Sequence, residues 1–236
     1  MQQFCGVNVI AYYSTSIFMA ANNTRSTALL VSMGTGIVNW IFAVPAVFTI
    51  DRFGRRNLLL VTFPLMALCL LLTGFAFNIT DAKARLCTIA TGLYLFMVVY
   101  SPGAGPVPFT YSAEAFPLHI RDIGMSASTA ITWGFNFIIS FSWPPMVQGF
   151  GNRGAFCWYA GWNVFGWVFA YFFLPETKSR TLEELDQVFS MTNRQHAKYY
   201  GSKLPWYAKK FTGQDVEPFL ELYAPLKQES ASQQSV

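Results

Sequence analysis

The stretch LLLVTFPLMALCLLLTGFAFNI at residues 58–79 decides the fold class of this 236-residue chain. It contains no charged side chain, and about 20 residues of helix are enough to cross the hydrocarbon core of a bilayer. The run is continuously apolar rather than alternating, and a backbone embedded in lipid must satisfy its own hydrogen bonds. We therefore predict a membrane-spanning α-helix here.

The same composition extends outward from this stretch along most of the chain. Hydrophobic residues make up 53% of the sequence and charged residues 12%, whereas soluble domains carry about 25% charged residues. Aromatic residues reach 17%, which suits the aromatic belts of membrane proteins. Five further apolar stretches of spanning length lie at residues 4–21, 28–50, 86–113, 123–148 and 155–174. We predict an all-α membrane protein, with a six-transmembrane-helix bundle at residues 1–175 and a cytoplasmic C-terminal tail at 176–236.

The positions of Lys and Arg predict the orientation, because cytoplasmic loops carry an excess of them. One side holds Arg52, Arg55, Arg56, Arg121, Lys178, Arg180 and Arg194, and the other holds Arg25, Lys83, Arg85 and Arg153. The first side, which includes the C-terminus, is therefore expected to be cytoplasmic.

The tail is more polar than the bundle. Thr181 and Glu184 form a capping box, which predicts a short amphipathic helix near residues 181–190. Farther on, the segment Lys203–Phe211 mixes lysines with aromatic residues. It either rests on the anionic inner leaflet or is a solvated tail without a partner.

Several classes of function are excluded by composition. The net charge is only +4, so no concentrated basic surface is available for nucleic acid. Two histidines and four cysteines without a CxxC pair predict no metal site and no cofactor. The motifs GxSxG and HExxH are missing, and an enzyme is not expected.

Neutral polar residues are the unusual feature of the predicted spans. Apart from Glu114 near the inner end of the fourth span, no acid or base lies deep in any of them, so this region shows no ion or proton pathway. The fifth span places polar residues on one face, at spacings of three and four: Thr129, Thr132, Trp133, Asn136 and Ser140. That face either forms hydrogen bonds between helices or lines a cavity for a neutral, hydroxyl-rich solute.

Two spans are expected to be broken. Gln3 and Asn8 lie about 140° apart on an unbroken helix, so they converge only if the helix breaks, and Gly6 offers the place. The fourth span carries five helix-breaking residues within one short segment, namely Pro102, Gly103, Gly105, Pro106 and Pro108. Transporters use broken helices around binding sites, although a structural kink is the alternative.

Four segments carry a family resemblance. QQFCGVNVIAYYS at 2–14, DRFGRR at 51–56, GAGPVPFTYSAEAFP at 103–117 and PETKSRTLEEL at 175–185 resemble, in order and spacing, the signatures of the sugar porter family of the major facilitator superfamily, with the fungal branch looking closest. Members of this family have twelve spans in two halves. The match begins at the seventh span, so the resemblance implies the C-terminal half of a carrier whose partner is a missing N-terminal six-helix half.

The resemblance also implies roles for individual residues. Substrate contacts are implied for Gln2, Gln3, Asn8, Asn39, Phe109, Trp133 and Asn136, and an outer gate for Tyr12 and Tyr13. A cytoplasmic gate charge network is implied for Arg55, Arg56, Glu114, Arg121 and Glu176. Glu114 is expected to pair either with Arg121 or with an arginine of residues 51–56. Phe109 stands where the family often has Trp, which leaves the identity of the sugar open.

The expected function is transport of a monosaccharide or related polyol by alternating access in the plasma membrane. Because one half cannot rock against itself, this hypothesis requires the other half, in a longer chain or as a separate one. The alternative is a truncated, transport-inactive six-span remnant that binds a partner.

Overall fold

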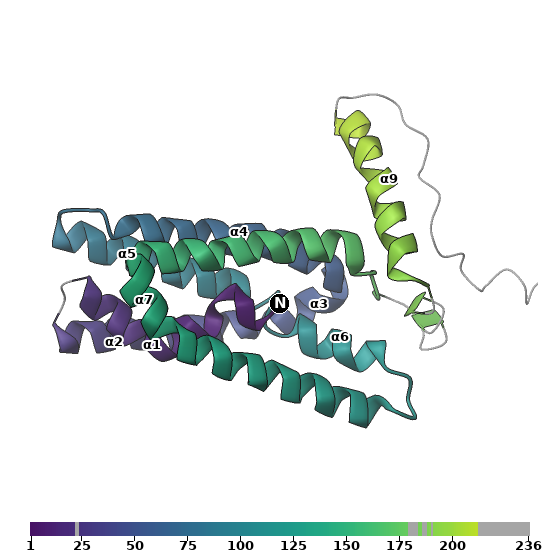
Figure 1. Ribbon diagram of the computed structural model, residues 1–236, viewed down its shortest axis with the longest axis horizontal. Coiled ribbons are helices and arrows are strands. Elements are labelled where there is room, and N and C mark those ends of the chain that lie inside the picture. Colours follow the sequence, from purple (N-terminus) through teal and green to yellow (C-terminus); the bar gives the residue numbers. More distant parts are fainter. Residues whose placement is uncertain (22–23, 179–183, 186–187, 190, 212–236) are drawn as a thin grey trace, which may run out of the picture.

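The computed structural model describes residues 1–21, 24–178, 184–185, 188–189 and 191–211, which form helices and turns with no strand among them. Most of the helices lie side by side along one axis, and α9 (Asn193–Phe211) leans away from this bundle at one end (Figure 1). The prediction of an all-α fold is thereby confirmed.

The chain enters the bundle through a broken helix. A short 3-10 helix, η1 (Gln3–Cys5), is followed by α1 (Val7–Ala20), and Gly6 between them has φ 95°. Glycine adopts this left-handed conformation without the steric cost that a Cβ atom would add. The predicted break at Gly6 is confirmed, and it places the N-terminal residues in the middle of the bundle (Figure 1).

The second apolar stretch is also broken, which the sequence analysis did not predict. It forms α2 (Arg25–Ala43) and α3 (Ala46–Phe53), with Pro45 between them. Pro45 has no backbone N–H and its ring crowds the preceding turn, so the helix is interrupted there. In contrast, Pro64 lies inside α4 without ending that helix.

The centre of the bundle is α4 (Arg55–Ala76), which packs against α5 (Ala82–Tyr100) and α7 (Arg121–Phe173). Its buried stripe includes Leu59, Phe63, Met66 and Leu70, at the three- and four-residue spacing of one helical face. After α5 the chain leaves the helical path at 101–106 and resumes as α6 (Val107–Ala115). This interruption confirms the break predicted from the Pro- and Gly-rich segment.

The long helix α7 contains two antiparallel arms (Figure 1). The helix is continuous except at Gly151, whose φ of 70° and ψ of 170° are not helical. The arms correspond to the predicted spans at 123–148 and 155–174. We call the end of the bundle that carries Gly54, Glu114 and Glu176 the charged end, and the end that carries Ala21, Ile79 and Gly151 the opposite end.

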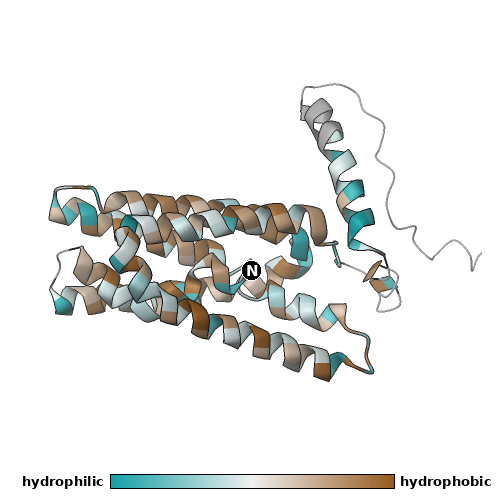
Figure 2. Ribbon diagram, in the orientation of Figure 1, coloured by the Kyte–Doolittle hydropathy of each residue, from teal (hydrophilic) through white to brown (hydrophobic). Residues whose placement is uncertain are grey.

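Apolar residues run along the helices of the bundle (Figure 2), and many of the large ones are exposed. On α4, for example, Val61 and Leu68 are each 61% exposed. Within the part of the chain that the structure describes, three helices, α2, α4 and α5, are long and apolar enough to cross a membrane. An apolar surface of this size suits contact with lipid, while the number of six spans stays a prediction.

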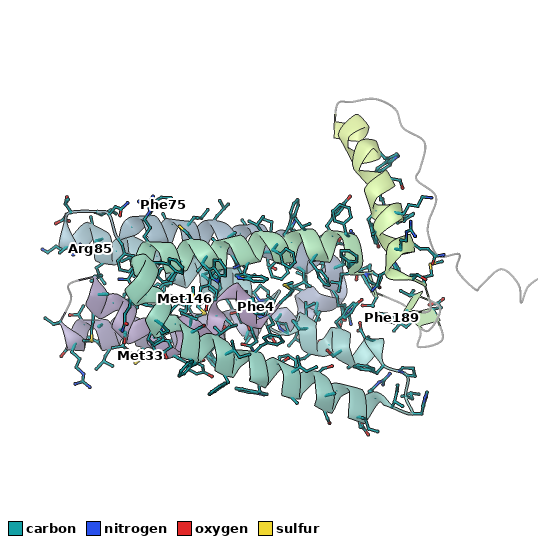
Figure 3. The ribbon with its side chains drawn as sticks, in the orientation of Figure 1. Phe4, Met33, Phe75, Arg85, Met146 and Phe189 are labelled. Atoms are coloured by element: carbon teal, nitrogen blue, oxygen red, sulfur yellow. The ribbon has the colours of Figure 1, made fainter. Side chains whose placement is uncertain are left out.

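The predicted amphipathic helix near 181–190 lies largely outside the described residues, including Thr181 of its capping box. Of the described residues in that range, Leu185 and Val188 are buried. Phe189 contacts the ring of Tyr111 edge-on, with 5.7 Å between centroids, at the charged end (Figure 3). The segment Lys203–Phe211 belongs to α9, a helix that the sequence analysis did not predict.

Candidate functional site

The two helix breaks bring the N-terminal amides together. Gln2 Nε2 donates to the carbonyl of Gly105 at 2.9 Å and to the hydroxyl of Tyr100 at 3.4 Å. Asn8 Nδ2 donates to Gln3 Oε1, across the break at Gly6. Gln3 and Asn8, the residues expected to converge, therefore do so between η1 and α1, while Gln2 contacts the interrupted segment 101–106.

A residue that the sequence analysis missed holds this arrangement. Asn163, on the second arm of α7, is fully buried, and its Nδ2 donates to the carbonyls of Cys5 at 3.0 Å and Tyr159 at 2.8 Å. It thereby ties the end of η1 to α7. A lone amide within an otherwise apolar predicted span was the available signal, since polar side chains at that depth need partners.

Asn39 joins the same region from α2. The hydroxyl of Ser101, the first residue of the interrupted segment, lies 2.7 Å from both Asn39 Oδ1 and the carbonyl of Met97. Ser101 was not singled out from the sequence. Because Gln2 and Asn39 both contact residues 100–105, the break in the fourth stretch connects η1 to α2.

A second hydrogen-bonded group links α1 to the first arm of α7. Asn136 Nδ2 donates to the hydroxyl of Tyr12 at 3.1 Å, and Ser140 Oγ donates to Asn136 Oδ1 at 3.2 Å. The hydroxyl of Tyr13 donates to the carbonyl of Ser140 at 2.8 Å. Two residues expected at a gate are thus bonded to the polar face predicted for the fifth stretch.

The aromatic residues expected in the site do not join these groups. Trp133 and Phe109 are 61% and 47% exposed, although Asn136, one turn after Trp133, is only 4% exposed. Phe4, next to Gln3 in η1, lies in the middle of the bundle (Figure 3). Its ring stacks on Trp162, with 4.6 Å between centroids.

Part of the expected charge network is assembled at the charged end. Arg55 pairs with Glu114 at 2.7 Å and with Asp51 at 3.0 Å. Glu176 Oε1 accepts a hydrogen bond from the backbone N–H of Arg55 at 3.0 Å. Glu176 therefore lies at the N-terminus of α4, where the free N–H groups of a helix favour a negative charge.

Close packing at Gly54 brings Glu176 to this position. Gly54 has φ 88°, and a Cβ atom there would lie 2.6 Å from Glu176 Oε2. Only glycine accommodates both the backbone conformation and the carboxylate. The glycine of DRFGRR thus packs against the glutamate of PETK, two segments far apart in the sequence.

The other two expected members of the network lie elsewhere. Arg56 donates to the carbonyl of Tyr171 at 2.9 Å, and its guanidinium lies 3.9 Å from the ring centroid of Tyr200 on α9. Arg121 donates to the carbonyl of Phe116 at 3.4 Å. Of the two partners considered for Glu114, the structure has an arginine of residues 51–56 rather than Arg121.

No group of three or more His, Cys, Asp or Glu able to hold a metal ion occurs among the described residues. The four cysteines are free thiols. The described buried polar residues are mainly amides and hydroxyls, which form neutral hydrogen bonds.

Known proteins resemble this chain in sequence and fold. The chain matches the family model "Sugar (and other) transporter" over residues 1–189. Polyol transporter 5 of Arabidopsis thaliana is 36% identical over 196 residues, which cover 80% of this chain and 36% of that protein. Myo-inositol transporter 2 of Schizosaccharomyces pombe is 34% identical over 194 residues, covering 79% of this chain and 34% of that protein.

A solved structure agrees with these matches. The proton:xylose symporter XylE bound to 6-bromo-6-deoxy-D-glucose superposes with a TM-score of 0.70 and 30% sequence identity, over 80% of this chain and 40% of that chain. The helical bundle with its broken helices therefore has the fold of a major facilitator transporter.

The chain belongs to the sugar (and other) transporter family, the sugar porters of the major facilitator superfamily. This family is a class of integral membrane transporters rather than of enzymes. The chain spans only 34% to 40% of the length of the relatives named above.

Proposed function

We propose that this chain forms the C-terminal half of a carrier that moves a sugar or related polyol across a membrane by alternating access. The observation that carries the proposal is the gathering of neutral amides at two helix breaks inside an apolar bundle. Gln2 bonds to Gly105, and Asn8 bonds to Gln3 across Gly6. Irregular backbone at membrane depth is typical of transporters, which place it around substrate sites.

The chemistry of these groups suits a neutral, polyhydroxylated substrate. An amide donates and accepts hydrogen bonds, as a hydroxyl does. Each exchanged hydrogen bond contributes about 0.5–1.5 kcal/mol, so a few of them bind a sugar weakly enough for release. The names of the two relatives, a polyol transporter and a myo-inositol transporter, support polyols as the first substrates to test. We assign substrate contacts to the predicted set Gln2, Gln3, Asn8, Asn39, Phe109, Trp133 and Asn136.

We assign the two gates to the opposite ends of this site. The hydrogen bonds from Asn136 to Tyr12 and from Tyr13 to Ser140 support an outer gate between α1 and α7. The ion pair of Arg55 with Glu114 supports an inner gate between α4 and α6. We assign the inner gate also to Arg56, Arg121 and Glu176. Of these, Arg56 and Arg121 donate to backbone carbonyls and do not take part in the ion pair of Arg55 with Glu114.

The proposal includes a partner and an orientation. Aromatic side chains lie open on α2, α3 and the first arm of α7, with Trp40 72% and Phe141 75% exposed. They suit packing against an N-terminal six-helix half. Residues 1–175 are then the transmembrane bundle, and 176–236 a tail on the cytoplasmic side of the plasma membrane in a fungal-type carrier. The arginines at the charged end support this orientation.

Uptake of radiolabelled myo-inositol, xylose and glucose tests the function. Cells expressing the complete carrier that contains this chain should show saturable uptake of at least one of them. The double substitution Gln3→Leu with Asn136→Leu should abolish it. Thr73→Val is the matched control, because it removes a hydroxyl that donates to the carbonyl of Cys69 within α4, away from the proposed site.

Two outcomes separate the carrier from the transport-inactive alternative. This chain expressed alone should not transport, and co-expression with an N-terminal half should restore uptake. Absence of uptake of every solute by the complete carrier, present at the cell surface, would contradict the proposal and favour the remnant.

A further inference from the structure

A cavity of about 320 Å³ lies near the opposite end, between α1 and α7. Tyr13 and Ser16 line it from α1, and Trp143, Gln148 and Asn152 line it from α7. Its volume is at the lower end of the range for small-molecule sites, about 300–1,000 Å³. The cavity is separate from the amides at Gly6 and from the ion pairs of the charged end.

The bend of α7 shapes this cavity. Gln148 belongs to the first arm and Asn152 to the second, on either side of Gly151 with its φ of 70°. Both nevertheless line the same cavity. Nothing lies within 4 Å of a Cβ atom built on Gly151, so its backbone conformation rather than close packing requires glycine there.

The lining selects a class of ligand. Two amides and two hydroxyls face the cavity together with an indole, and none of its lining residues, all of them described, carries a charge. Ser16 and Gln148 are exposed, so a solute can reach their polar groups. A neutral molecule with several hydroxyls supplies partners to both amides, whereas an ion would find no counter-charge.

Aromatic packing keeps one wall of the cavity in place. Trp143 is 3% exposed, and its ring lies 5.5 Å from that of Phe156 and 6.0 Å from that of Tyr159, centroid to centroid. On the cavity side its ring is 6.3 Å from that of Tyr13. A rigid aromatic wall beside two amides resembles the chemistry of a carbohydrate site, where the apolar face of the ligand packs on a ring.

Tyr13 connects this cavity with the group around Asn136. It lines the cavity, and its hydroxyl donates to the carbonyl of Ser140, whose side chain donates to Asn136. We propose that the cavity is a second, peripheral binding site for a neutral polyhydroxylated solute, on the path to the site around Asn136. This inference rests on the proposed function and adds a subsite to it.

Protection of an introduced cysteine tests the site directly. Ser16 is exposed and lines the cavity, so Ser16→Cys should react with a maleimide. The experiment uses the purified complete carrier in detergent, with Cys87→Ser and Cys157→Ser to lower background labelling. At a myo-inositol concentration of about ten times its dissociation constant, labelling should slow by about tenfold. Labelling of Ser26→Cys, exposed on α2 at the same end, should not change.

Three further variants decide which site gives the protection. Protection should persist with Asn136→Leu and disappear with Gln148→Leu plus Asn152→Leu. Ala20 also lines the cavity, so Ala20→Trp should fill part of it and remove the protection. This variant replaces the double variant if the double variant does not fold. Protection lost with Asn136→Leu but kept in the cavity variants would overturn the subsite. Normal uptake without protection would overturn the subsite alone, while protection without uptake would support the cavity and overturn the proposed transport.

Discussion

In the proposed complete carrier, the substitution Asn163→Leu should raise the KM for transport without unfolding the protein. Asn163 is fully buried, and its Nδ2 donates to the carbonyls of Cys5 and Tyr159 at 3.0 and 2.8 Å. Its Oδ1 has no hydrogen-bond partner among the described residues. Leucine has a similar size and removes both the two hydrogen bonds and the buried oxygen.

The two effects on global stability nearly cancel. Two neutral hydrogen bonds contribute together about 1–3 kcal/mol, and an unpaired buried oxygen costs about 1–3 kcal/mol. The free energy of unfolding should therefore change by no more than about 2 kcal/mol in either direction. The local effect does not cancel, because the carbonyl of Cys5 loses the amide that ties η1 to α7.

The expected change in KM follows from that local loss. If the gathered arrangement of Gln2, Gln3 and Asn8 is destabilised by about 1 kcal/mol, its population relative to alternatives falls about fivefold. Apparent affinity falls with the population of the competent state. KM should rise by up to about fivefold at unchanged Vmax, since release and the gates are not touched.

Uptake kinetics and thermal unfolding of the same preparations provide the assay. Thr73→Val is the matched control, because Thr73 is also fully buried and its hydroxyl donates to the carbonyl of Cys69 at 2.9 Å. That control should leave KM unchanged. An unchanged KM in Asn163→Leu, or an equal rise in both variants, would refute the positioning role of Asn163.

Three further predictions concern stability and the charged end. Glu114→Gln should lower the free energy of unfolding by about 1–3 kcal/mol in a thermal or denaturant melt, because it leaves the largely buried Arg55 without its closest carboxylate. Gly6→Ala should cost about 1–2 kcal/mol in the same melt and raise KM, since alanine is strained at φ 95°. Tyr200→Leu should remove about 0.5–2 kcal/mol of cation–π contact with Arg56 and speed tryptic cleavage of α9.

Each of these predictions has a control in the same chain. Asp51 is 75% exposed, so Asp51→Asn should change stability far less than Glu114→Gln. Gly36 has open space around it and a helical conformation, so Gly36→Ala should not destabilise. Tyr200→Phe keeps the ring and should be cleaved at the native rate. A variant that behaves like its control would show that the proposed contact has no energetic role.

Helices and their breaks were largely readable from the sequence. Continuous apolar runs predict helices because the bilayer leaves the backbone no other way to satisfy its hydrogen bonds. Gly6 and the segment 102–108 stood out because glycine and proline act on the backbone locally. The break at Pro45 was missed, while Pro64 stays within a helix. Whether a proline interrupts a helix depends on neighbouring packing, which local sequence does not contain.

The family motifs and the type of polar group were also determined by the sequence, since residue identity alone decides that the interior carries amides and hydroxyls. Only the tertiary structure decided their partners. It pairs Glu114 with Arg55 rather than Arg121, turns Trp133 to the surface while Asn136 is buried, and brings Asn163 to Cys5. Such contacts join residues far apart in the chain, and they depend on the angles at which helices cross and bend. Gly151 shows the difference: the sequence contains the glycine, but only the folded chain places Gln148 and Asn152 around one cavity.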